Sequence, residues 1–211
     1  MKLNIKFGIQ FEKNRIKNTF SKLSWYKAHG YNLEIPLGIN EESSDEEIIV
    51  AVKLNFKEKD YENHANKLMN DFSLIEKKFH NALKKTFRDQ KISDTLEIYL
   101  TKYGTGGSYN LPNIVIKNIS HSKSGVKTIF HEIIHLMIEP LVKKFGVNQW
   151  EKERIVDLIL NSKEFDFLKY NSWQPFYQGT ERYIDSLFNK QFFGNPVAFF
   201  SMINETRTRS N

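Results

Sequence analysis

The chain has 211 residues, of which 31 are basic and 25 acidic, so its formal net charge is +6. This length is sufficient for a buried core, and fractions of 40% hydrophobic and 27% charged residues are ordinary for a globular protein. The absence of cysteine excludes disulfides, cysteine-ligated zinc, iron–sulfur clusters and a thiol nucleophile. With 10 glycines and 5 prolines, collagen-like and Pro/Gly-rich disordered classes are excluded as well.

No targeting or membrane segment is expected. In the opening residues, MKLNIKFGIQFEKNR, charged or amide residues interrupt every short apolar run, so no signal-peptide core is present. No stretch of the chain approaches the roughly 18 apolar residues of a membrane helix. The sequence therefore predicts a cytoplasmic protein without membrane contact, although leaderless export would leave no trace in it. Basic and acidic residues alternate along most of the chain, which is typical of solvated helices, so nucleic acid is not the expected partner.

In the N-terminal part, hydrophobic patterns predict one strand and two helices. Lys2–Phe7 alternates like a strand, and a helix is predicted from Phe11 to Ala28, ended by Gly30. Glu46–Phe56 is an apolar element whose type the pattern does not decide. From Asp60 to Phe87, apolar residues recur every three or four positions, which predicts a helix with one core-facing side.

The middle of the chain predicts two strands and a buried helix. The strands are Thr95–Lys102 and Asn113–Asn118, and Tyr103–Asn110 joins them with the sequence YGTGGSYN. This glycine-rich segment lacks the Lys-Ser/Thr ending of a P-loop, so we interpret it as a flexible turn. Val126–Phe145 is apolar around nearly its whole circumference, which predicts a buried helix. Either of two serines before it, at positions 122 and 124, can cap that helix.

The C-terminal part is predicted to be mainly helical. Gly146 ends the buried helix, and a further helix is expected at about Asn148–Leu160. After an aromatic loop around Trp173–Tyr177, the pattern predicts helices at Thr180–Asn189 and Asn195–Ile203. The elements together predict an α+β fold.

The buried helix carries the sequence His131-Glu132-Ile133-Ile134-His135. Histidines four residues apart lie on one helical face, so both imidazoles can reach a single ion. Glu132 lies about 100 degrees further round the helix, where it can hold a metal-bound water without joining the ligands. Burial of three such polar groups is costly without compensation, which a zinc ion would supply.

The next helix adds two carboxylates four residues apart, Glu153 and Asp157. Seventeen residues separate His135 from Glu153, enough for the helix to end and the chain to return. Glu153 can then be a third ligand, and Asp157 can accept a hydrogen bond from a ligating imidazole. Glu139 and Asp185 are alternative carboxylate ligands.

The scattered histidines at positions 29, 64, 80 and 121 are interpreted as surface or half-buried side chains. Two other interpretations of the motif remain open. One is a buried histidine pair that only satisfies backbone carbonyls, and the other is a zinc site that is structural or inactive.

The pattern His131-Glu132-x-x-His135 followed by Glu153-x-x-x-Asp157 resembles the gluzincin metallopeptidases, the thermolysin-like branch of the zincins. The resemblance extends over about one sixth of the chain. It implies a zinc ion held by His131, His135 and Glu153, with Glu132 as the general base and Asp157 behind His131.

The resemblance also implies a zincin-like fold, in which a small sheet packs over the active-site helix. Residues 1–90 would then form an N-terminal mixed lobe and residues 91–211 the catalytic region, as separate parts or as one continuous domain. The edge strand of the sheet would pair with an extended peptide substrate, and Asn113–Asn118 is the candidate for that strand.

The chain departs from related groups at several positions. Ile138 and Leu141 stand where the metzincin extension requires Gly and His, and the Gly-x-Met-Glu-Asn segment of the related aminopeptidases is missing. Because no histidine follows His135, the residue that steadies the tetrahedral intermediate would be a tyrosine, with Tyr177 the choice and Tyr183 the alternative.

The sequence therefore predicts a zinc metallopeptidase that hydrolyses peptide bonds through a zinc-activated water, with Glu132 as general base and Zn2+ as cofactor. A peptide or protein is the expected substrate, and a protease with one narrow target fits the same pattern. The alternative is a catalytically inactive zincin-like module that binds a protein or nucleic-acid partner.

Overall fold

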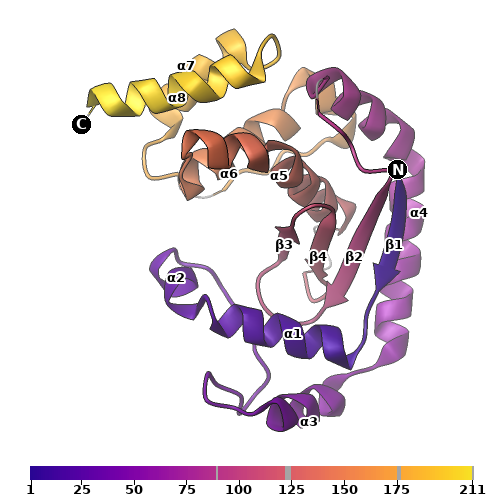
Figure 1. Ribbon diagram of the computed structural model, residues 1–211. Coiled ribbons are helices and arrows are strands. Elements are labelled where there is room, and N and C mark those ends of the chain that lie inside the picture. The colour runs from indigo at the N-terminus through magenta and orange to yellow at the C-terminus, as the bar shows by residue number, and fades with distance from the viewer. Residues whose placement is uncertain (89, 122–124, 175–176, 211) are drawn as a thin grey trace. The chain divides into compact units, whose positions relative to one another are not determined.

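The protein, described by a computed structural model over residues 1–88, 90–121, 125–174 and 177–210, has an α+β fold (Figure 1). In chain order the elements are β1 (Lys2–Lys6), α1 (Ile9–Phe20), α2 (Leu23–Ala28), α3 (Asp45–Asn55), α4 (Glu58–Thr86), β2 (Thr95–Thr101), β3 (Gly107–Asn110), β4 (Ile114–Asn118), α5 (Gly125–Phe145), α6 (Gln149–Leu160), the 3-10 helix η2 (Lys163–Leu168), α7 (Glu181–Gln191) and α8 (Pro196–Ser210).

The chain divides into two compact units. The first unit comprises Met1–Leu74 and Ser93–Ile129, and the second comprises Ile75–Ile92 and Phe130–Asn211. Helices α4 and α5 each begin in the first unit and end in the second. The expected division of the chain at residue 90 stays a prediction.

The first unit contains a four-stranded sheet in the order β1-β2-β4-β3. Strands β1, β2 and β4 are parallel, and β3 pairs antiparallel with β4. On one face, Leu100 and Lys117 line a cavity together with Leu68 of α4. On the other face, the ring of Tyr99 lies 4.7 Å from that of Phe11 in α1. Because neighbouring residues of a strand point to opposite faces, α1 and α4 cover the two sides of the sheet.

Two expectations for this sheet are wrong. The segment Tyr103–Asn110 is not only a turn, because its second half forms β3 and pairs with β4. Asn113–Asn118 is not an edge strand, because β4 pairs with β2 on one side and with β3 on the other. The four residues GSYN of β3 show no apolar alternation, so the sequence pattern did not reveal the strand that covers this edge.

The glycine-rich segment approaches the buried Arg15 of α1 closely. Arg15 donates to the Thr105 hydroxyl at 2.7 Å and to the Ser108 hydroxyl at 2.9 Å. A Cβ atom at Gly104, whose φ is +82°, would overlap the Arg15 guanidinium. Glycine at this position therefore serves a close approach between two parts of the chain.

The single helix expected from Phe11 to Ala28 is wrong, because the structure has two helices, α1 and α2, separated at positions 21 and 22. Near the break, the Thr19 hydroxyl donates to the Arg15 carbonyl and the Ser21 hydroxyl to the Asn18 carbonyl. Such side chains compete for backbone carbonyls and weaken helix continuation.

The other N-terminal elements agree with the patterns. Glu46–Phe56, whose type was undecided, forms helix α3, which begins with a capping box between Ser44 and Glu47. The long helix expected over Asp60–Phe87 is confirmed as α4. Most positions of the predicted apolar pattern are buried, namely Tyr61, Leu68, Phe72, Phe79, Leu83 and Phe87, and Ile75 is half-buried.

The second unit is helical wherever regular structure is described. The predicted helices at Val126–Phe145, Asn148–Leu160 and Thr180–Asn189 are confirmed as α5, α6 and α7. The last predicted helix, Asn195–Ile203, is present as α8 and is longer than expected. Phenylalanine rings make much of the core, and those of Phe79 and Phe130 are 4.1 Å apart. The two serines expected as caps of α5 lie outside the described residues.

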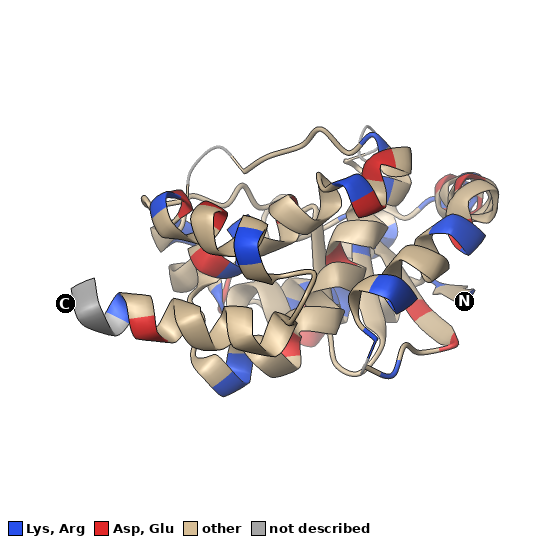
Figure 2. Cartoon of the chain, turned by 90° about the horizontal axis from the view of Figure 1, so that it is seen from above, with Lys and Arg blue, Asp and Glu red and all other residues tan. Residues whose placement is uncertain are grey.

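Among the described residues, no helix combines the length and apolar character that crossing a membrane requires. Basic and acidic residues are interspersed along the helices (Figure 2). Several of them pair, as Lys13 and Lys17 do with Asp45, and Lys67 with Asp71. The alternation of charges in the sequence thus becomes local ion pairing on these helices.

Candidate metal centre

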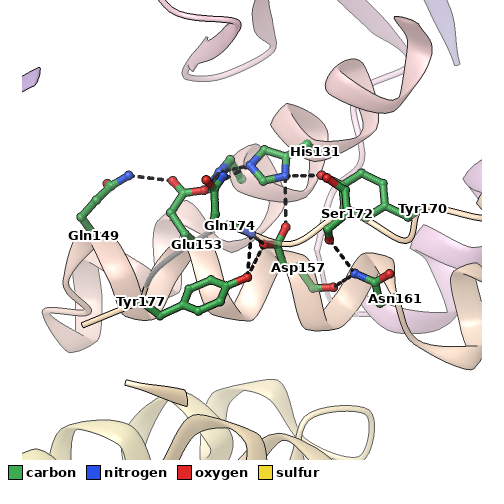
Figure 3. A network of polar contacts seen from close by, with 10 residues as sticks. His131, Gln149, Glu153, Asp157, Asn161, Tyr170, Ser172, Gln174 and Tyr177 are labelled. Carbon is green, nitrogen blue, oxygen red and sulfur yellow. Dashed lines mark hydrogen bonds and ion pairs between the residues drawn. The ribbon is translucent and has the colours of Figure 1, made fainter. Parts of the chain in front are cut away.

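Two helices of the second unit bring three potential ligands together (Figure 3). Helix α5 supplies His131 and His135, one turn apart, and α6 supplies Glu153. His131 Nε2 lies 3.0 Å from His135 Nε2 and 3.2 Å from Glu153 Oε2, and His135 Nε2 lies 3.4 Å from the same oxygen. Among the described residues, this is the group of histidine and acidic side chains whose atoms converge closely enough to hold a metal ion.

The spacing of these three atoms fits a tetrahedral zinc ion. Ligands bonded to zinc at about 2.0–2.1 Å in a tetrahedron lie roughly 3.3 Å from one another. The observed separations are 3.0 to 3.4 Å. Two imidazole nitrogens and a carboxylate oxygen are also a donor set that zinc accepts. The residues present therefore fit the metal.

The electrostatics of the cluster favour a cation. Burial lowers the pKa of His135 to about 4, so its imidazole is neutral near pH 7. Burial also lowers the pKa of His131, but the carboxylates of Glu153, Glu132 and Asp157 outweigh it and raise that pKa to about 9. Burial opposes ionisation of Glu153, yet the two histidines hold its pKa well below the usual value. A proton on His131 or a metal ion would each supply the positive charge.

The second oxygen of Glu153 is held by Gln149. The Gln149 side-chain amide donates to Glu153 Oε1 at 2.6 Å, one turn earlier on α6. This hydrogen bond leaves Oε2 directed at the two histidines. Sequence reasoning missed Gln149, although its spacing of four residues from Glu153 could have indicated the contact.

Asp157 lies on the opposite side of the His131 ring. Its Oδ1 atom is 3.7 Å from His131 Nδ1, and its Oδ2 accepts from the Tyr177 hydroxyl at 2.6 Å and from the Gln174 backbone N–H at 2.9 Å. Asp157 thus lies behind His131, where the resemblance implies it. The hydroxyl of Tyr177 is on Asp157, so the expected oxyanion role of Tyr177 stays a prediction.

A second tyrosine, which sequence reasoning missed, contacts the same imidazole. The Tyr170 hydroxyl lies 2.9 Å from His131 Nδ1 (Figure 3). Tyr170 follows η2 in an irregular segment, where no periodicity relates a residue to its neighbours in space. No signal in the sequence could have assigned it to the site.

Glu132 is buried in α5, with 5% of its surface exposed. Its carboxylate raises the pKa of His131 and that of Tyr170, so it lies close enough to both side chains for an electrostatic effect. A buried carboxylate beside the cluster is suited to accept a proton from a group bound there.

In comparisons with known proteins, no family model, curated protein or solved structure matches this chain.

The alternative site residues lie in other contacts. Glu139 lies 3.6 Å from Lys143, and Asp185 forms two hydrogen bonds with Arg154, at 2.8 and 2.6 Å. The Tyr183 hydroxyl donates to Glu151. Among the scattered histidines, contacts with Trp25, Asp60 and Glu34 are made by His29, His64 and His121 respectively.

Proposed function

We propose that the chain is a zinc-dependent metallopeptidase of the gluzincin type. The observation that carries the proposal is the convergence of His131, His135 and Glu153 within 3.0 to 3.4 Å of one another. Catalytic zinc sites use three protein ligands, whereas structural sites use four. No fourth histidine or acidic side chain of the described residues joins this group. The donor set therefore supports a catalytic site over a structural one.

Each polar side chain around the cluster has a defined role in this proposal. When bound, a zinc ion would supply Lewis acidity for a peptide carbonyl and lower the pKa of water. Glu132 would accept the proton of the attacking water and return it to the leaving amine. Asp157 and Gln149 would orient the ligands His131 and Glu153.

The gluzincin proposal includes a zincin-like fold and an extended peptide substrate that adds a strand to a sheet edge. An edge strand offers backbone N–H and C=O groups to a peptide, whereas both sides of β4 are already paired.

Metal content is the first test. Tag-free wild-type protein and His135→Ala would be compared by plasma mass spectrometry after incubation with zinc and gel filtration. We expect about one zinc per chain in the wild type and loss of most of it in the variant, because His135 supplies one of three ligands. Absence of metal in both proteins would contradict the proposal.

The second test concerns the reaction. Glu132→Gln should retain zinc and lose nearly all hydrolysis of a peptide library, because the amide cannot accept the proton of water. Retained hydrolysis would contradict the role of Glu132. Zinc binding without hydrolysis of any peptide by the wild type would favour an inactive zincin-like module or a protease with one narrow target.

A further inference from the structure

The Nδ1 side of His131 is held by two oxygens. The Tyr170 hydroxyl lies 2.9 Å from Nδ1, and Asp157 Oδ1 lies 3.7 Å from it, while Nε2 faces His135 and Glu153. An imidazole that ligates a metal through Nε2 carries a proton on Nδ1, and that proton needs an acceptor. In this protein the nearer acceptor is a tyrosine hydroxyl, not the carboxylate.

A second tyrosine holds the carboxylate. Asp157 Oδ2 accepts from the Tyr177 hydroxyl at 2.6 Å and from the Gln174 backbone N–H at 2.9 Å. These two bonds engage one oxygen of Asp157 and leave Oδ1 on the His131 side. The rotamer of Asp157 is therefore set by the segment that carries both tyrosines.

Arg154 of α6 holds the ring of Tyr177. The Arg154 guanidinium carbon lies 4.8 Å from the centroid of the Tyr177 ring and 4.7 Å from that of Trp173. The same guanidinium is bound by both carboxylate oxygens of Asp185. A guanidinium oriented by a carboxylate at two atoms presents a planar face to aromatic rings.

The backbone around both tyrosines is strained. Lys169, Asn171 and Gln178 have φ values of 45°, 44° and 53°, and they are the non-glycine residues with positive φ in the described part of the chain. Each directly neighbours Tyr170 or Tyr177. Left-handed conformations of such residues cost free energy and persist only where surrounding contacts hold them, often at functional sites.

We propose that Tyr170 and Tyr177 are positioning residues that set the metal affinity of the cluster, Tyr170 by accepting from His131 Nδ1 and Tyr177 by orienting Asp157. The inference rests on the proposed metal site but not on peptidase activity. Loss of the Tyr170 hydroxyl leaves the Nδ1 proton with only Asp157 Oδ1, which at 3.7 Å is beyond hydrogen-bond distance. Loss of the Tyr177 hydroxyl removes a donor that fixes the rotamer of Asp157. In both variants the imidazole is less well oriented towards the metal.

The test is zinc affinity of the full-length protein, measured by competition with a chromophoric chelator. Tyr170→Phe and Tyr177→Phe remove only the hydroxyl oxygen. Each should weaken zinc binding by about 10- to 100-fold, the usual effect of losing a partner of a ligating histidine. The absorption spectrum of the cobalt-substituted protein should change in Tyr170→Phe as well, because the orientation of a ligand changes.

Tyr183→Phe is the matched control. The Tyr183 hydroxyl also donates a hydrogen bond to a buried carboxylate of α6, but that carboxylate is Glu151, which is not part of the cluster. If the tyrosine hydroxyls served only folding, Tyr183→Phe and Tyr177→Phe would both be less stable than the wild type. The zinc affinity of the folded protein would then be unchanged in both variants. We expect the affinity of Tyr183→Phe to stay within about twofold of the wild type.

The outcomes separate the two proposals. A wild type that binds zinc, with unchanged affinity in both Tyr170→Phe and Tyr177→Phe, would overturn this inference and leave the metal site standing. A wild type without zinc would overturn both. Should Tyr177→Phe fail to fold, Asp185→Asn tests the same chain of contacts to Tyr177 through Arg154, away from the cluster. Its predicted loss of affinity is smaller, and no loss would overturn the role of Tyr177.

Discussion

Glu151 and Glu153 lie two residues apart on α6, and both are buried. Glu151 accepts from the Asn148 backbone N–H at 2.7 Å and from the Tyr183 hydroxyl, and it lies 3.2 Å from Arg207. The hydrogen bond to Asn148 caps the N-terminus of α6, and Arg207 places a permanent positive charge beside the carboxylate. Burial of Glu151 is thereby compensated within the protein.

Glu153 has a different set of partners. One of its oxygens accepts from Gln149, and the other faces His131 and His135. No Lys or Arg pairs with Glu153 among the ion pairs of the described residues. Its compensation depends on protons or a metal ion that the surroundings supply. Burial alone thus does not distinguish a structural carboxylate from a candidate ligand, and the identity of the partners does.

The largest expected effect concerns Glu153. Glu153→Ala should weaken zinc binding by more than the roughly 10- to 100-fold expected for an outer partner, because it removes a ligand. Competition with a chelator would measure it. Glu139→Ala is the matched control, since Glu139 belongs to the histidine-bearing helix and lies beside Lys143. Stronger zinc loss in Glu139→Ala than in Glu153→Ala would reassign the third ligand.

The ligands that the sequence predicts, and the carboxylate of Asp157 beside them, all lie on two regular helices. A period of 3.6 residues relates His131 to His135 and Glu153 to Asp157, so spacing alone indicates which side chains share a face. Tyr170 lies in an irregular segment, where spacing carries no direction. Residues such as Tyr170 can be assigned to the site only from the folded structure.

The helices and strands of the fold differ in the same way in how well the sequence predicts them. Long amphipathic segments such as α4 and α5 were predictable because many apolar positions agree on one period. Strand β3 was not, because four residues with one glycine carry too little pattern. The inner position of β4 followed from its pairing with β3, so one missed strand caused two errors in the sheet.

The next largest effect concerns Glu151, the other buried carboxylate of α6. Glu151→Ala should lower the free energy of unfolding by about 3 to 4 kcal/mol, because it leaves Arg207 and the N-terminus of α6 without their acceptor. Zinc affinity should stay unchanged. Urea unfolding of the metal-free protein measures the first quantity, and chelator competition the second. A Glu151→Ala variant that keeps its stability but binds zinc poorly would contradict this comparison, because the contacts of Glu151 would then support the metal site.

Glu12 of the first unit is a third buried carboxylate and extends the comparison. It accepts from the Tyr61 hydroxyl and from the Lys102 backbone N–H, both neutral donors. Burial raises its pKa to about 7 against these hydrogen bonds and the charges of Lys102 and Arg15. The shift is opposite to that of Glu153, although both side chains are buried.

This raised pKa predicts a pH dependence of stability. Between pH 4.5 and pH 7, the unfolded chain has lost the proton that folded Glu12 keeps, so this group lowers the free energy of unfolding as the pH rises. The fall is at most about 3 kcal/mol and is complete above pH 7. Glu12→Gln does not titrate, so urea unfolding at pH 4.5 and pH 8 should show a smaller decrease for the variant. Parallel decreases in both proteins would contradict the assignment.

The smallest effect concerns Gln149, the residue next to the cap of α6. Gln149→Leu removes the donor to Glu153 Oε1, so the carboxylate can rotate and its Oε2 is less well directed at the histidines. We expect about a tenfold loss of zinc affinity, or roughly 1.4 kcal/mol, by chelator competition. In a Glu153→Ala background the same substitution should have no further effect, because Gln149 acts through the carboxylate that is missing. An equal loss in both backgrounds would mean that Gln149 contributes to the site by another route than Glu153.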